Sequence, residues 1–307
     1  MLTALVVPLK VVINFTWGAV FTALVGLSVI IVGLCKALIP MNAWQRFCSR
    51  LANTLFRVWG FAMAKMFSLT QPVQWHITGA ANINRHGWYM ILCNHRSWVD
   101  IPVLMYLAAR HQMPMPRFFL KQQLIWVPFV GLGCWALDMP FMKRYSRELL
   151  AKKPHLQGKD IATTQRSCQR FRHIPTTVIN FCEGTRFTAE KHAQKNSPYR
   201  YLLTPKAGGT AFSLQAMGEQ FDAILDITIS YPQQQGGALV WNFLAGRLRH
   251  IDVHIETLPV TPDLIGDYAN DEAFRQHFQA WLNQRWQQKD QHIEQALQRL
   301  RSKGAGT

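Results

Sequence analysis

A histidine and an aspartate, His95 and Asp100, stand five residues apart directly after the apolar run 88–93. A neutral imidazole is the usual general base near pH 7, and a carboxylate can fix its tautomer and stabilise the cation that it becomes. Such a pair could remove a proton from an alcohol. Alternatively, Ser97 or Asp100 could cap a following helix, and a capping aspartate could still orient the histidine.

The spacing constrains the elements that must position this pair. Residues five apart on one regular helix point about 140° away from each other. The two side chains can meet if His95 ends a strand over 88–93 and Asp100 begins a helix over 100–110. Pro102 fits the first turn of that helix, where its missing N–H costs little. Strand-to-helix turns are also where sheet proteins tend to carry chemistry.

Composition narrows the classes of partner. The 307 residues include 33 Lys and Arg against 17 Asp and Glu, a formal charge of +16. This charge attracts nucleic acid, anionic lipid headgroups or phosphorylated substrates. Because 49% of the residues are hydrophobic and only 16% are charged, we expect a membrane surface and no nucleic acid. The six cysteines are scattered, so we expect no disulfide framework and no metal site.

Residues 1–70 are predicted to form a membrane anchor. The stretch 11–35 carries no charge, and as a helix it would be about 37 Å long, enough to cross a bilayer core of about 30 Å. More basic residues follow this stretch than precede it, which predicts that everything beyond residue 36 lies on the cytoplasmic side of a cell inner (cytoplasmic) membrane. Residues 51–69 form either an interfacial amphipathic helix, which we favour, or a second membrane helix.

The rest of the chain has the pattern of an α/β domain over 71–265, with helices on the faces of a sheet. The run 124–137 is too short to span a membrane, and it is either buried core, the commoner case, or a membrane-dipping wall of a lipid site. Residues 266–307 are predicted to be an amphipathic helix, docked on the domain, and a short tail. The strands are expected at 88–93, 176–181, 222–231 and 250–256.

A second group of polar residues, Glu183 to Arg186, follows the strand expected at 176–181. Gly184 allows a sharp turn, and Arg186 offers a planar fork suited to phosphate. Glu183 is a poor neighbour for phosphate, so we expect it to hold a basic residue or the turn. The alternative is an ordinary polar loop.

Three further cations stand beside apolar or helix-start segments. Lys121 and Arg144 could hold an anionic headgroup at an apolar boundary, or they are snorkelling surface charges. Thr204 and Pro205 predict a helix start in which Lys206 adds charge next to the helix N-terminus, a favourable place for anions.

In this order and at these separations, the blocks resemble the glycerolipid acyltransferase family, in particular the 1-acylglycerol-3-phosphate (lysophosphatidate) acyltransferases. The match covers roughly residues 73–231. His95 and Asp100 correspond to its His-x4-Asp motif, Arg144 to its second block, Glu183-Gly184-Thr185-Arg186 to its third, and 224–229 to its fourth. Cys182 stands where the family usually has proline, and 225–227 replace a usual Val-Pro-Val.

The resemblance implies a mixed sheet flanked by helices and an acyl transfer from acyl-CoA or acyl carrier protein to the free hydroxyl of a lysophospholipid in a membrane. His95 would act as general base without an acyl-enzyme and without any cofactor. The acceptor would be bound by Lys121, Arg144, Glu183, Gly184, Thr185, Arg186 and Lys206.

Two alternatives remain beside the first choice of 1-acylglycerol-3-phosphate as acceptor. The variant blocks are similar to those of remodelling enzymes, so the acceptor could be lysophosphatidylglycerol or lysocardiolipin. A non-enzymatic, basic, membrane-anchored binding protein would fit the charge, but it gives no reason for a histidine and an aspartate at a strand end. The lack of a Gly-x-Ser-x-Gly segment argues against a serine hydrolase.

Overall fold

The computed structural model of the chain describes residues 2–70, 73–79, 83–118, 120–139, 141–142, 174–232 and 238–304. The strands are β1 (Gln74–Thr78), β2 (Tyr89–Cys93), β3 (Met115–Phe118), β4 (Leu120–Lys121), β5 (Phe141–Met142), β6 (Thr176–Phe181), β7 (Ala223–Ser230) and β8 (His250–Leu258). The α-helices are α1 (Leu2–Leu38), α2 (Asn42–Thr70), α3 (Asp100–Arg110), α4 (Val130–Ala136), α7 (Ala189–Gln194), α8 (Gly208–Met217), α9 (Ala238–Leu244) and α10 (Glu272–Gly304). Short 3₁₀ helices are η1 (Gln122–Trp126), η3 (Gly218–Gln220) and η4 (Pro262–Leu264).

The main sheet of the described segments is mixed, with strand order β1-β8-β7-β2-β6-β3. β2 lies at its centre, parallel to both β6 and β7, whereas β7 and β8 pair antiparallel. Every residue of β2 is buried, as expected for a strand with helices on both faces. The strands predicted at 88–93, 176–181, 222–231 and 250–256 are confirmed. The sequence did not indicate β1 or β3, which are the edge strands.

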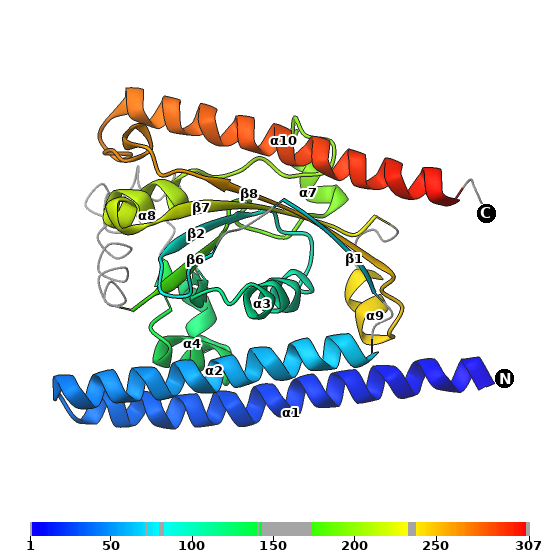
Figure 1. The fold of residues 1–307 in the computed structure, drawn as a ribbon, viewed down its shortest axis with the longest axis horizontal. Helices are drawn as coiled ribbons and strands as arrows, with labels where there is room; N and C mark the ends of the chain where they lie inside the picture. Colours follow the sequence, from blue (N-terminus) through cyan, green and yellow to red (C-terminus); the bar gives the residue numbers. More distant parts are fainter. Residues whose placement is uncertain are drawn as a thin grey trace.

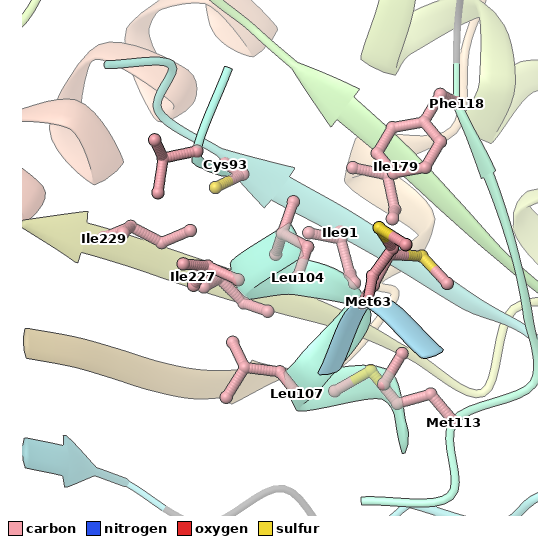
Figure 2. Close-up of a cluster of buried hydrophobic side chains, with 14 of the residues drawn as sticks. Met63, Ile91, Cys93, Leu104, Leu107, Met113, Phe118, Ile179, Ile227 and Ile229 are labelled. Carbon is pink, nitrogen blue, oxygen red and sulfur yellow. The ribbon is translucent and has the colours of Figure 1, made fainter. Parts of the chain in front are cut away.

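Helices cover both faces of the sheet (Figure 1). On one face, α3 packs beneath β2 and β7, with α2 and α1 below it. Figure 2 shows this core, where Leu104 and Leu107 of α3 meet Ile91 of β2 and Met63 of α2. On the other face lie α8 and α10, and the predicted docking of the C-terminal helix is confirmed because Trp286 at its centre is fully buried.

α1 and α2 form an antiparallel helical hairpin along one side of the domain (Figure 1). Within the described residues, one helix, Val7–Leu38 of α1, is long and apolar enough to cross a membrane, and only 11% of its most apolar window is buried. α1 also contacts α4 and α9. The predicted apolar helix over 11–35 is therefore present, and 51–69 belongs to a longer helix beside it.

The run 124–137 forms η1 and α4 rather than a buried core segment. Gly131, Gly133 and Ala136 of α4 are buried, but Trp126 is 85% exposed and Phe129 and Leu132 are about half exposed. The expectation of buried core was therefore wrong for the side of this segment that carries Trp126, Phe129 and Leu132. The opposite side of α4 packs on α1.

Candidate active site

The parallel pairing of β2 with β6 assembles the candidate site. Cys93 at the end of β2 lies opposite Phe181 at the end of β6. The segments that follow the two strands, with His95 and Glu183, therefore meet at one edge of the sheet. The His95 ring stacks on the Phe181 ring at a centroid distance of 4.0 Å.

His95 and Asp100 are in direct contact. The His95 Nδ1 atom lies 2.8 Å from Asp100 Oδ2. A carboxylate only accepts hydrogen bonds, so Nδ1 carries the proton in the neutral ring and Nε2 has a free lone pair. This is the arrangement of a general base held by a carboxylate.

The carboxylate of Asp100 is fully buried and receives hydrogen bonds from several sides. Its Oδ2 atom accepts from the backbone N–H groups of Arg96 at 2.7 Å and Ser97 at 2.9 Å. Its Oδ1 atom accepts from the Tyr231 hydroxyl at 2.7 Å. Helix α3 has Val99 as its N-cap residue, without a side-chain bond from that residue. Two residues earlier, the Ser97 hydroxyl accepts from the Val99 N–H at 3.3 Å and Asp100 accepts from the Ser97 N–H, as in a capping box. Asp100 therefore holds both the start of the helix and the imidazole, so the two interpretations hold together.

Glu183 ties this loop to the third block. Its two carboxylate oxygens accept from the backbone N–H groups of His95 at 3.0 Å and Leu203 at 3.1 Å. Burial raises the pKa of Glu183 to about 8, against the opposing effects of these two hydrogen bonds and of the Arg96 cation. These contacts place Glu183 in the role of holding the turn rather than of touching a phosphate.

Gly184, Thr185 and Arg186 lie beside the histidine. Gly184 has a φ of 67°, a conformation that glycine adopts without steric cost. The Arg186 guanidinium lies 4.5 Å above the ring of Trp98, and Lys191 Nζ donates to Thr185 Oγ1 at 2.9 Å. The exposed arginine is thus oriented by an aromatic face and remains accessible to an anion.

The other predicted cations are less close to the pair or are not described. Arg144 lies outside the described residues, and for Lys121 the structure describes only the backbone, at the end of β4. Lys206 is exposed, and its backbone N–H donates to Cys182 O at 2.7 Å. The predicted helix start at Thr204 was wrong, because α8 begins at Gly208 without a side-chain cap.

A mostly apolar cavity of about 1000 Å³ opens beside His95. Its described lining includes His95, Trp98, Gly184, Thr185 and Arg186 together with residues of α1, α2 and α4. This volume is at the upper end of the range for small-molecule sites. Among the described residues, no cluster of three His, Cys, Asp or Glu side chains could hold a metal ion.

Two residues that hold the site were not found from the sequence. Tyr231 ends the strand run predicted at 222–231, but nothing in the sequence links it to Asp100, 131 positions away. The buried Asn94 side chain bonds both backbone groups of Ile229 at 2.9 Å, fixing the start of the histidine loop to β7. For Asn94, its position next to His95 was a signal in the sequence that it could belong to the site.

The fold and the site together define an α/β domain with a histidine–aspartate pair beside a mostly apolar cavity. The chain belongs to the Acyltransferase family, whose family model matches residues 74–231. The fold is similar to the crystal structure of the 1-acyl-sn-glycerophosphate (LPA) acyltransferase PlsC from Thermotoga maritima. That likeness has a TM-score of 0.50 and 14% identity, and it covers 95% of this chain and 98% of that one.

Several curated proteins are similar at low identity. The 2-acyl-1-lysophosphatidylinositol acyltransferase of Saccharomyces cerevisiae is 26% identical, over 66% of this chain and 60% of its own length. Lysocardiolipin acyltransferase 1 of Gallus gallus is 26% identical over 66% of this chain and 52% of its own. The human 1-acyl-sn-glycerol-3-phosphate acyltransferase delta is also 26% identical, over 67% and 52%. This chain therefore spans about half to three-fifths of the length of these relatives.

Proposed function

We propose that this acyltransferase transfers a fatty acyl group from acyl-CoA or acyl carrier protein to the free hydroxyl of 1-acylglycerol-3-phosphate, producing phosphatidate. The observation that carries the proposal is the 2.8 Å contact between His95 and the buried Asp100, at the edge of an apolar cavity. An imidazole base serves the acceptor hydroxyl, and the cavity is suited to acyl chains.

In the proposed reaction, the Nε2 atom of His95 takes the proton of the acceptor hydroxyl as the oxygen attacks the thioester carbonyl. Asp100 keeps Nε2 free and stabilises the imidazolium. When the tetrahedral intermediate collapses, the carbon–sulfur bond breaks and the imidazolium returns its proton to the leaving thiolate. The acceptor itself is the nucleophile, so no acyl-enzyme and no cofactor is required.

Arg186 is the proposed ligand of the acceptor phosphate. It lines the same cavity as His95 and is stacked on Trp98, so its fork is already oriented for a bidentate contact. Lys121, Arg144 and Lys206 are proposed as supporting cations around the headgroup.

A second candidate acceptor is another lysophospholipid, such as lysophosphatidylglycerol or lysocardiolipin. The observation that favours it is the similarity to proteins named as lysocardiolipin and lysophosphatidylinositol acyltransferases. The same His95 chemistry would serve each of these acceptors.

The exposed apolar face of α1 and the membrane lipid substrates of the proposed reaction support membrane association. We place the catalytic domain on the cytoplasmic side of the inner membrane, because the basic residues that follow the apolar stretch favour that side. Labelling of introduced cysteines in the domain by an impermeant reagent, in cells and in inverted vesicles, tests this placement.

The test of function is acyl transfer from labelled acyl-CoA by the purified protein, and in parallel from acylated carrier protein. Lysophosphatidate, lysophosphatidylglycerol and lysophosphatidylethanolamine serve as acceptors. Wild type should transfer most rapidly to lysophosphatidate, and His95→Ala should lose roughly 100- to 10,000-fold of this activity while its thermal unfolding stays the same. Transfer retained by folded His95→Ala would refute the mechanism. Faster transfer to one of the other two acceptors would identify that lipid, instead of lysophosphatidate, as the substrate.

A further inference from the structure

A second cavity, of about 750 Å³, lies at the turn between α1 and α2 and is separate from the site of His95. It is bounded by the end of α1, the first three turns of α2, the end of α4, and Ile174 and Pro175. These last two residues precede β6, whereas His95 stacks on Phe181 at the opposite end of that strand. The intervening strand is about 17 Å long.

The charge of this cavity is positive. Among the described lining residues, three cations, Lys36, Arg46 and Arg50, face one carboxylate, Asp138. Lys36 already pairs with Asp138 at 2.7 Å. Within the described part of the chain, no carboxylate pairs with either arginine, although both are exposed beside the same cavity. The cavity therefore offers two guanidinium groups that lack an anion.

Two polar side chains of α2, Ser49 and Asn53, also line the cavity. Ser49 is 8% and Asn53 is 9% exposed, and neither is among the side chains whose polar atoms are fully buried without a partner. Their hydroxyl and amide groups therefore remain accessible from the cavity and can hydrogen-bond to a ligand there. Because these residues share one face of α2 with Arg46 and Arg50, a polar ligand in the cavity would reach all four side chains.

The surroundings indicate which anion fits. Leu34, Leu38, Met41 and Phe47 are exposed apolar side chains around the same turn, and they continue the apolar surface of α1. A ligand held here would have its charged part in the cavity and apolar surface beside it. A diacyl phospholipid has this combination, whereas a soluble phosphate ester does not.

We propose that this cavity binds the phosphodiester headgroup of an anionic glycerophospholipid of the membrane, at a site distinct from the acceptor site. Arg46 and Arg50 contact the phosphate oxygens. Ser49 and Asn53 hydrogen-bond to the headgroup, and the acyl chains lie along the exposed side chains of the turn. The lipid is a bound structural partner rather than a substrate, because it lies at the far end of β6 from His95.

Binding of phosphatidylglycerol and phosphatidylcholine to the full-length protein in nonionic detergent, followed by native mass spectrometry, tests the proposal. Wild type should bind phosphatidylglycerol more tightly than phosphatidylcholine. The double variant Arg46→Gln/Arg50→Gln should bind it roughly tenfold more weakly, since a tenfold change is about 1.4 kcal/mol, the scale of a hydrogen bond to a charged group. Asn53→Ala should weaken binding severalfold without a change of charge.

The matched control is Arg57→Gln, an exposed arginine one turn beyond Asn53 on the same helix but not among the cavity residues. It should bind phosphatidylglycerol as wild type does. An equal loss in Arg57→Gln, or equal binding of the two lipids by wild type, would refute a specific site. Release of phosphatidylglycerol by millimolar glycerol 3-phosphate would show that the site takes a soluble phosphate ester and would overturn the assignment to lipid.

Two further measurements keep these results interpretable. Thermal unfolding verifies that each variant is folded, and Asn53→Ala retains the test if the double arginine variant does not fold. Acyl transfer in mixed micelles of phosphatidylcholine and nonionic detergent should be the same in wild type and in all of these variants. The binding result does not depend on that activity, so failure of the proposed function would leave it standing.

Discussion

The loop that carries His95 and the wall of the cavity beside it are built in different ways. Around His95, directional hydrogen bonds fix the groups: Asp100 alone accepts from two backbone N–H groups, the Tyr231 hydroxyl and the imidazole. The described wall of the cavity comes mostly from apolar side chains of α1, α2 and α4. Beyond the cavity, α1 and α4 meet through small side chains, and Gly33 of α1 lies so close to Ala136 that an added Cβ would be 2.4 Å from the Ala136 Cβ.

This difference in construction matches two proposed tasks of the site, proton transfer in the loop and chain binding in the cavity. The chemistry depends on a few atoms within a fraction of an ångström, and buried polar bonds provide that definition. In the proposed reaction the cavity accepts flexible acyl chains, for which apolar surface and room suffice. We therefore expect substitutions in the loop to change rates, and substitutions in the wall to change which chain is accepted.

The largest effect is expected for Asp100→Asn. The amide can donate to Nδ1 of His95, so that Nε2 would carry the proton and could no longer act as a base. Transfer should fall roughly a thousandfold with little change in the Michaelis constants. Steady-state kinetics of the folded variant measure this, and a loss of less than tenfold would show that the carboxylate is not needed to hold the tautomer.

Glu183→Gln should change how stability depends on pH. The pKa of Glu183 is raised from its ordinary value of 4.5 to about 8 in the folded protein. Between these values the native state holds a proton that the unfolded state has released, so its contribution to the free energy of unfolding declines as pH rises from about 5 to 8. A glutamine at position 183 does not titrate, so the variant lacks this contribution to the pH dependence of the free energy of unfolding.

The stability difference between wild type and Glu183→Gln should therefore shrink from pH 5 to pH 8. Thermal unfolding in detergent at both pH values measures it, with His95→Ala as a control for general damage to the loop. A difference that grows with pH would mean that Glu183 is ionised in the fold.

Tyr231→Phe should lower kcat roughly tenfold, since a hydrogen bond to a charged group contributes about 1.5–3 kcal/mol and the backbone donors to Asp100 remain. Because Tyr231 acts through Asp100, KM for donor and acceptor should stay constant. A combined fall in kcat and rise in KM would instead indicate that the tyrosine shapes the binding site. Burial raises the pKa of Tyr231 well above its usual value, so the hydroxyl remains a donor throughout the working pH range.

Gly133→Leu should give the smallest effect on rate but a clear effect on selectivity. Gly133 lines the cavity from α4, and an added Cβ would meet nothing within 4 Å. The leucine should fill part of the cavity, so the ratio of dodecanoyl to octadecanoyl transfer rises by roughly tenfold, about 1.4 kcal/mol.

The matched variant is Gly33→Ala, where the added methyl group meets Ala136 and forces α1 away from α4. It should lower the thermal midpoint without favouring shorter chains. If Gly133→Leu left the ratio of dodecanoyl to octadecanoyl transfer unchanged, the acyl chain would not occupy the part of the cavity beside Gly133.

Much of the fold around β2 could be predicted from local patterns. Its apolar run, the turn after Cys93 and the helix containing Pro102 are set by neighbouring residues, and the structure has β2 and α3 at these places. The helix start predicted at Thr204 failed by a few residues, and another prediction failed on packing. The run 124–137 is as apolar as a core segment, but in the described part of the chain it packs on α1 with one side and exposes Trp126, Phe129 and Leu132 on the other.

The sequence by itself determined the pair proposed to carry the chemistry, because His95 and Asp100 are joined by a short turn that local geometry can close. It also determined an apolar first helix and a formal charge of +16. Only the tertiary structure decided that Tyr231 and Glu183 hold this pair, and that α1 and α4 enclose the cavity. These contacts join segments about 90 to 130 residues apart, and the alignment of β2 with β6 and β7 brings them together.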